Sequence, residues 1–324
     1  MKMKTIAVIV SALTLGSTAP SPPTASLITV DKNVKLEVLD WGGSGRPLVL
    51  LAGLGDTAHV FDDFAPKLTT TCHVYGITRR GFGNSFAPPP STENYSADRL
   101  GDDVLAVSES LQLYRPVLVG HSFAGEELSS IGSRHPDKVA GLIYLEAAYS
   151  YAYYDPSQGD LLLDALELRK KLDQLIAGNG SQDRKQLGRE LLQIVPQFKK
   201  DLDEQQKALQ LMPARTQRPD EVPLVIQALL SGEQEFTNIR APILAIFADP
   251  HDIGSMFKDD PAARATAEAM DVAYVGAQAK AVETGLPSAH VVRLPNASHY
   301  VFKSNEADVL REINAFLTSL AISR

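Results

Sequence analysis

Gly120-His121-Ser122-Phe123-Ala124-Gly125 is the stretch that decides how this chain folds. It follows the apolar run Pro116–Val119 and precedes a helix-like segment, Glu126–Ser133. A strand, a tight turn and a helix with a serine at the apex form the arrangement called a nucleophile elbow. The apex backbone is expected in the left-handed region, with φ above zero. Such a turn would expose the Ser122 hydroxyl at a helix N-terminus, where backbone N–H groups favour developing negative charge.

The residues flanking the serine satisfy the steric demand of this turn. Positions two before and two after the apex crowd each other, so both side chains must be small. Gly120 and Ala124 meet that demand.

Composition limits the class of protein. The chain has 324 residues, which suits one large α/β domain with an insertion or two ordinary domains. A hydrophobic share of 44% is enough to bury a sizeable core. The net charge of −8, with no basic cluster, argues against a nucleic-acid partner. The single cysteine, Cys72, cannot form an intrachain disulfide. The sequence leaves the oligomeric state open.

The N-terminal segment has the pattern of a signal peptide. Two early lysines precede the apolar run Thr5–Leu15, and small residues follow, with Ala19 or Ala25 at a suitable cleavage position. We therefore expect residues 1–25 to be removed and the mature protein to be exported, to the periplasm or outside the cell. The apolar run is too short for a stable membrane span, and we find no later candidate.

The rest of the chain alternates predicted strands and helices. Alternation of this kind indicates a mostly parallel sheet with helices on both faces. Eight strands are predicted, at 27–40 (an antiparallel pair), 47–51, 73–77, 116–119, 139–145, 242–247 and 289–294. Helices are predicted at 60–68, 96–113 with Ser96 as N-cap, 126–133, 160–177, 183–195, 202–211, 222–231, 261–285 and 306–320.

The domain organisation follows from the helical block after the sixth strand. Residues 26–150 and 237–324 would form the two parts of an α/β core, and residues 151–236 a helical cap. We expect the cap to cover the carboxyl ends of the strands, where open α/β sheets bind ligands.

Activating the serine requires a base and an acid. A serine hydroxyl attacks only when a histidine, held by a carboxylate, takes its proton. His299 follows the last predicted strand and is the candidate base. For the acid we favour Asp252 in the loop after Phe247, with Asp249 in the same loop as the second candidate. Glu146 is a third candidate, although we expect it to brace the loops around the site.

Two backbone N–H groups are needed to hold an oxyanion. We assign one to Phe123, directly after the serine, and the other to Leu54 in the loop after the third strand. Gly53 and Gly55 flank Leu54 and would let the backbone approach a substrate.

These motifs together resemble the α/β-hydrolase superfamily over nearly the whole chain after the leader. The matching stretches are Gly53–Gly55, Arg80–Ser85, Gly120–Gly125, the Asp252 loop and His299. Three residues depart from the family pattern. Ala124 stands where glycine is usual, Thr78 where an aspartate is common, and Ala52 where a histidine often precedes the oxyanion glycine, which could alter how that loop is braced.

The resemblance implies an α/β-hydrolase fold and acyl-transfer chemistry on a small-molecule acyl substrate, without cofactor or metal. We expect a serine esterase with the triad Ser122, Asp252 and His299. A serine at the apex argues against dehalogenases and epoxide hydrolases of this fold, whose nucleophile is aspartate. Within the same fold, an aminopeptidase, an amidase or a hydrolase of carbon–carbon bonds remains an alternative. An alternative of another class is a non-catalytic ligand-binding protein.

Overall fold

A computed structural model of the chain describes residues 22–177, 181–211 and 222–322. Most of the predicted leader, residues 1–21, lies outside this part. Thr24 and Ala25 lie in the first strand, where they pair with Asp40 and Leu39. Cleavage after Ala19 would leave this strand whole. None of the helices described is long and apolar enough to cross a bilayer.

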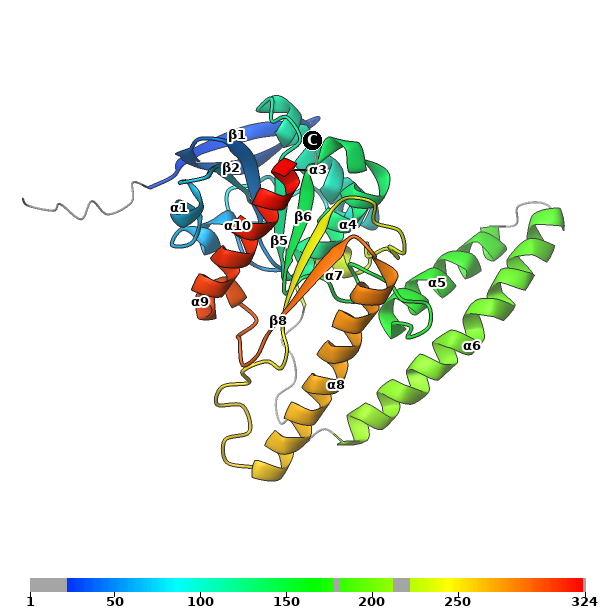
Figure 1. Cartoon of the computed structure of the whole chain (residues 1–324). Helices are drawn as coiled ribbons and strands as arrows, with labels where there is room; N and C mark the ends of the chain where they lie inside the picture. Colours follow the sequence, from blue (N-terminus) through cyan, green and yellow to red (C-terminus); the bar gives the residue numbers. More distant parts are fainter. Residues whose placement is uncertain (1–21, 178–180, 212–221, 323–324) are drawn as a thin grey trace, which may run out of the picture.

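One eight-stranded sheet organises the molecule (Figure 1). Its spatial order is β1-β2-β4-β3-β5-β6-β7-β8. The first two strands are antiparallel, and β3 to β8 run parallel to one another. The strands are β1 (Thr24–Asp31), β2 (Val34–Gly43), β3 (Arg46–Leu51), β4 (Cys72–Ile77), β5 (Val117–His121), β6 (Gly141–Leu145), β7 (Ile243–Ala248) and β8 (Ala289–Leu294).

Helices cover both faces of the sheet, as the alternating pattern predicts. Buried side chains of α3, α4 and α8 form one core with the sheet, and those of α1, α9 and α10 form the other. The helices are η1 (Ala58–Phe61), α1 (Ala65–Leu68), α2 (Thr92–Tyr95), α3 (Ala97–Ser110), η2 (Ser122–Ala124), α4 (Gly125–Arg134), η3 (Pro136–Lys138), α5 (Leu161–Ala177), α6 (Ser181–Leu211), α7 (Leu224–Leu230), α8 (Pro261–Gly285), α9 (Val301–Ser304) and α10 (Glu306–Ile322).

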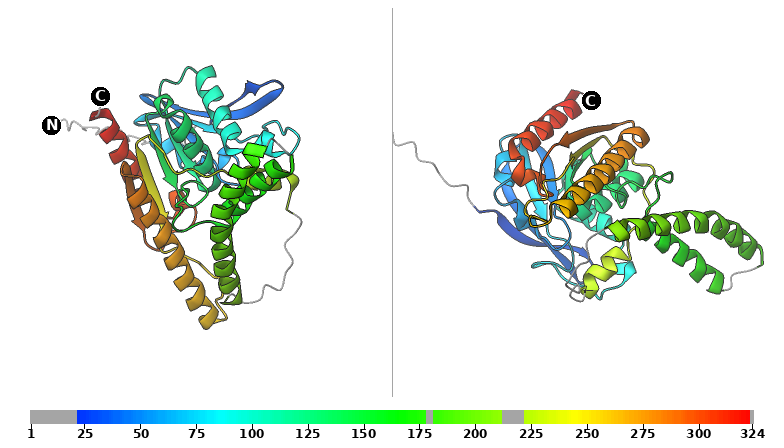
Figure 2. Two further views of the ribbon diagram at one scale, coloured as in Figure 1. Left: turned by 90° about the vertical axis from the view of Figure 1, so that its right-hand side faces the viewer. Right: turned by 90° about the horizontal axis from the view of Figure 1, so that it is seen from below.

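The insertion between β6 and β7 contains α5, α6 and α7. Helices α5 and α6 form a hairpin that projects from the body, and α6 and α8 both extend beyond the sheet (Figures 1 and 2). The chain therefore has an α/β-hydrolase fold with a helical insertion after the sixth strand, as predicted.

Two helix predictions need correction. The single helix expected over 60–68 is split into η1 and α1, because Pro66, at the start of α1, has no N–H to continue a preceding helix. The two helices expected at 183–195 and 202–211 are one helix, α6, which continues through Pro196. Packing of α6 against α5, with an ion pair of 2.7 Å between Lys171 and Glu190, supports this continuity.

Candidate active site

The nucleophile elbow has the predicted backbone. Ser122 has a φ of 52°, in the left-handed region that non-glycine residues rarely adopt. A Cβ added at Gly120 would lie 2.9 Å from Leu128 and 3.1 Å from the Ala124 carbonyl oxygen, which explains the need for a small residue. The Ser122 hydroxyl makes no hydrogen bond within the described residues, and its side chain is partly exposed. It is therefore available to a base and to a substrate.

The loop after β3 lies against this serine. A Cβ added at Gly53 would come within 3.1 Å of the Ser122 Cβ and 3.0 Å of His121 Nδ1. Only glycine allows this close approach. The loop carrying Leu54 thus meets the start of η2, where Phe123 lies, so the two residues predicted to supply oxyanion donors flank the serine.

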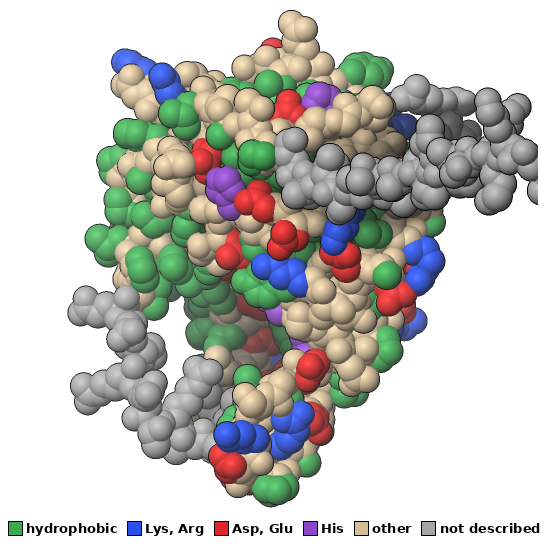
Figure 3. Space-filling view, turned by 90° about the vertical axis from the view of Figure 1, so that its left-hand side faces the viewer, with side chains coloured by type: hydrophobic (Ala, Val, Ile, Leu, Met, Phe, Trp, Pro, Cys, Tyr) green, Lys and Arg blue, Asp and Glu red, His purple; other side chains and the backbone are tan. Residues whose placement is uncertain are grey.

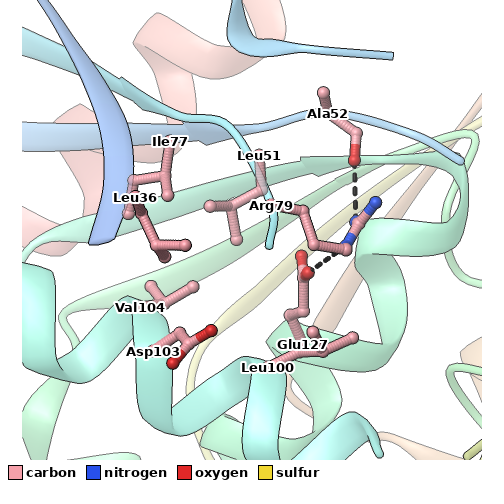
Figure 4. A pocket seen from close by; sticks show the side chains of 9 residues that line it. All are labelled: Leu36, Leu51, Ala52, Ile77, Arg79, Leu100, Asp103, Val104 and Glu127. Carbon is pink, nitrogen blue, oxygen red and sulfur yellow. Dashed lines mark hydrogen bonds and ion pairs between the residues drawn. The ribbon is translucent and has the colours of Figure 1, made fainter. Parts of the chain in front are cut away.

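A buried arginine holds the chain just before this loop. Arg79 donates to the Ala52 carbonyl at 2.8 Å and to the Gly53 carbonyl at 3.2 Å. Its Nε donates to Glu127 Oε1 at 2.5 Å, and both side chains are only 4% exposed. Figure 4 shows this ion pair at the wall of a small cavity, with Arg79 directed at Ala52. Arg79 therefore braces the loop where Ala52 replaces the usual histidine.

Glu146 is the carboxylate that reaches His299. Its Oε2 lies 3.2 Å from His299 Nδ1, and the Glu146 side chain is fully buried. Oε1 accepts from the Ala248 backbone N–H at 2.5 Å, and Tyr149 donates to both oxygens at 3.0–3.1 Å. Burial opposes the charged form, but the hydrogen bonds from His251 and His299 outweigh it and hold the pKa of Glu146 below its usual value.

The backbone of Glu146 is also unusual. Its φ of 52° places a non-glycine residue in the left-handed region directly after β6. Outliers of this kind persist where the surrounding structure fixes them, and they cluster at functional sites.

The aspartates favoured by the sequence lie elsewhere. Asp252 is exposed, and its carboxylate accepts from the Gly254 backbone N–H at 2.8 Å. Asp249 accepts from Arg293 at 2.8 Å. The structure thus brings Glu146, and not Asp252 or Asp249, within hydrogen-bond distance of His299. The physical reason is that the loop after β7 directs His251, and not an aspartate, toward the site. Asp252 is held in a local turn with Gly254, and Asp249 pairs with Arg293.

His121 links the elbow to the loop that carries His299. Its Nε2 donates to the His299 carbonyl oxygen at 3.0 Å, and the two rings lie 4.8 Å apart. Burial, together with the nearby His299, lowers the pKa of His121 to about 4, so its ring is neutral at pH 7. Since His121 precedes Ser122, this bond fixes the His299 loop beside the serine. His299 itself is exposed at the surface of the site.

The candidate site residues follow the carboxyl ends of β5, β6, β7 and β8, the edge where open α/β sheets bind ligands. Figure 3 shows one face hollowed, with histidine and acidic side chains visible inside the hollow. Ligand atoms of three residues, Glu146, His251 and His299, lie within 4.8 Å of one another. Hydrogen bonds already join them, so the arrangement favours a chain of proton donors and acceptors over a metal site.

A second buried carboxyl, Glu126, lies one helical turn after the serine. Its side chain is 0% exposed, and neither oxygen has a hydrogen-bond partner of ordinary geometry. Burial, with Glu233 and Glu127 nearby, raises the pKa of Glu126 well above its usual value. The folded protein therefore favours the protonated, neutral form of Glu126.

This burial makes a stability prediction. Above about pH 4.5 the unfolded chain loses the Glu126 proton while the folded protein keeps it, so folding becomes less favourable as pH rises. Glu126→Gln removes this effect. Thermal unfolding should show little difference between variant and parent at pH 4, and a higher stability of the variant than of the parent at pH 8. Glu204→Gln, on the exposed face of α6, is the control, and an equal Glu126→Gln effect at both pH values would contradict the prediction.

Comparison with known proteins settles the family. The sequence profile of the alpha/beta hydrolase family matches residues 48–312, most of the chain. This chain belongs to the alpha/beta hydrolase family. The match spans β3 to α10, and so includes the elbow, Glu146 and His299.

Curated relatives match only part of this chain. Fluoroacetate dehalogenase of a Burkholderia species is 32% identical over 116 residues, 35% of this chain and 38% of that protein. Epoxide hydrolase A of Mycobacterium tuberculosis is 30% identical over 139 residues, 42% of each chain. The matched segments span about two fifths of these relatives.

Solved structures support the fold over a greater length. An esterase from Thermogutta terrifontis superposes with a TM-score of 0.55 at 18% identity, covering 92% of this chain and 99% of the other. E-2-(acetamidomethylene)succinate hydrolase gives a TM-score of 0.54 at 19% identity, covering 91% and 99%. The relatives and structural neighbours of this chain are thus named for reactions on chemically different bonds.

Proposed function

We propose that this hydrolase cleaves a carboxylic ester, or a related acyl bond of a small molecule, through Ser122, His299 and Glu146. The observation that carries the proposal is the connected site. A strained serine follows β5, and a histidine tied to the same elbow through His121 follows β8. A buried carboxylate 3.2 Å from that histidine follows β6, at the same edge of the sheet. The serine at the apex supports acyl chemistry over the reactions named for the dehalogenase and epoxide hydrolase relatives.

The mechanism follows from the roles of these groups. His299 Nε2 accepts the Ser122 proton as the serine oxygen attacks the substrate carbonyl carbon. Glu146 holds the His299 ring through Nδ1 and stabilises the imidazolium. His299 then protonates the leaving alcohol, and an acyl-serine ester remains. Water, deprotonated by His299, attacks this ester and releases the acid and Ser122.

The oxyanion of each tetrahedral intermediate would be held by the backbone N–H groups of Phe123 and Leu54. Each such donor contributes about 3 kcal/mol to the transition state. The Arg79 brace on Ala52 and Gly53 supports this role because it fixes the start of the Leu54 loop.

A fluorophosphonate probe tests the nucleophile. We expect the folded protein to be labelled at Ser122 and to hydrolyse p-nitrophenyl esters, and Ser122→Ala to abolish labelling and to reduce turnover at least about 10³-fold. Ser110→Ala, exposed at the end of α3, is the control and should match the parent. Folded protein that is neither labelled nor active would contradict the proposal and favour a ligand-binding role.

The bond type is tested on the same preparation. Faster turnover of aminoacyl anilides than of esters would identify an aminopeptidase or amidase. Turnover only of substrates with a cleavable carbon–carbon bond would identify a hydrolase of carbon–carbon bonds. We also propose, from the leader pattern of residues 1–25, that the mature enzyme is exported.

A further inference from the structure

A second histidine, His251, contacts the buried Glu146 carboxylate. His251 Nε2 lies 2.5 Å from Glu146 Oε2, the same oxygen that faces His299 Nδ1. The two imidazole rings are 6.4 Å apart. Glu146 is therefore held between two histidines that come from different loops.

Asp271 fixes His251 by two bonds. Asp271 Oδ1 lies 2.8 Å from His251 Nδ1, and its Oδ2 accepts from the His251 backbone N–H at 2.8 Å. Asp271 is part of α8, whereas His251 lies in the loop after β7. His251 also forms a bridge with Ala297, two residues before His299. The loop after β7, the loop after β8 and α8 are thus tied together at Glu146.

The hydrogen-bond pattern defines the charge on His251. Both of its ring nitrogens face carboxylates, which only accept, and a neutral imidazole can donate from one nitrogen alone. Both contacts are satisfied when the ring is protonated. Burial opposes this charge, but Glu146 and Asp271 outweigh it and raise the pKa of His251 to about 9. The titratable groups facing His251 are Glu146, Asp271 and the more distant His299; the neighbouring Asp252 turns to Gly254.

His251 and His299 are not interchangeable. Both ring nitrogens of His251 are engaged, one by Glu146 and the other by Asp271. His299 uses Nδ1 for Glu146, and its Nε2 makes no hydrogen bond within the part of the chain that the structure describes. Only His299 therefore has a nitrogen available for Ser122.

We propose that His251, clamped by Asp271, is a positioning residue that fixes the Glu146 carboxylate in its charged form and directs it at His299. The inference rests on the proposed function, because it assigns a partner to the acid of the same site. It also gives a role to His251 in the loop after β7, which supplies a positive charge to Glu146, the acid that follows β6. Two carboxylates, Glu146 and Asp271, and one protonated imidazole, His251, together carry one net negative charge. This charge balances the positive charge that His299 gains when it takes the Ser122 proton.

The first test is the pH dependence of fluorophosphonate labelling at Ser122, with ester kcat/KM as a second readout. The parent rate should fall above about pH 9 as His251 loses its proton and one carboxylate loses its donor. His251→Gln should lower the rate at pH 7.5 about 10- to 100-fold, the scale known for partners that orient metal-ligating residues. It should also abolish the alkaline fall. Asp271→Asn should move that fall to lower pH, because the Asp271 carboxylate no longer raises the pKa of His251.

Matched controls separate positioning from folding. His59→Gln removes a histidine that pairs with Asp62 in an exposed position and should leave the rate and its pH profile unchanged. Unfolding temperatures of all variants identify losses due to stability alone. A His251→Gln enzyme that keeps the parent pH profile, whatever its stability, would overturn the proposal.

A third measurement is independent of turnover. Nitrogen-15 NMR of the histidine rings in the full-length protein should find His251 protonated at both nitrogens at pH 7, and His251→Gln should shift the His299 signals. A neutral His251 at pH 7 would overturn the positioning role even if no substrate is found. Absence of labelling at Ser122 in the parent would instead contradict the proposed function, and the NMR result would still decide the state of His251.

Discussion

Glu146→Gln is expected to reduce kcat/KM by about 10⁴-fold, the scale seen when the acid of a serine triad becomes an amide. The amide can present an N–H to His299 Nδ1, which favours the wrong tautomer of the base. It also carries no charge to stabilise the imidazolium. The glutamine is close in size to Glu146, so the buried site should keep its shape. The measurement is steady-state hydrolysis of the best p-nitrophenyl ester, together with the rate of Ser122 labelling.

Asp252→Asn and Asp249→Asn are the matched controls. Asp252 is exposed in a local turn, and Asp249 pairs with Arg293, so neither change should lower kcat/KM more than a few-fold. A loss at Asp252 comparable to that at Glu146 would restore Asp252 as the triad acid. It would also mean that the loop after β7 rearranges when substrate binds.

Arg79→Met is expected to lower the free energy of unfolding by about 3–5 kcal/mol, because it leaves the Glu127 carboxylate buried without its cation. The same change removes the donors to the Ala52 and Gly53 carbonyls. Ester turnover should therefore fall in the fraction that stays folded. Denaturant unfolding and the labelling rate at Ser122 measure the two effects separately.

The double variant Arg79→Met/Glu127→Leu separates stability from positioning. Replacing both members of a buried ion pair with apolar groups often restores stability. We expect the double variant to regain most of the lost unfolding free energy while turnover stays low, since no side chain then braces the Ala52–Gly53 backbone. Recovery of turnover together with stability would contradict the bracing role of Arg79.

The fold was predictable where local pattern and tertiary structure agree. The bounds predicted for 261–285 and 289–294 are those of α8 and β8. Ser96 caps α3 as expected, with its side chain accepting from the Arg99 backbone N–H. Local signals were weaker around proline. Pro66 lies in the first turn of α1, the second of two short helices, whereas Pro196 does not interrupt α6. A proline removes one N–H, but whether a helix continues depends on what packs beside it.

The candidate acid was the part that local pattern could not select. Asp249, Asp252 and Glu146 all follow a strand and precede a helix, so spacing ranks them only weakly. The roles of His251 and Asp271 left no signal, because both depend on contacts between segments 20 to 105 residues apart. A φ above zero at Glu146 is the one local feature that could have favoured it, and the sequence does not reveal it.

The sequence by itself determined the elbow. Small residues around Ser122, an apolar run before it and a helical segment after it allow one backbone path, because steric exclusion acts between near neighbours. Tertiary structure alone decided which carboxylate meets His299 and which cation stands behind it. Those contacts depend on where three separate loops end at the edge of the sheet, a property of packing that no single segment encodes.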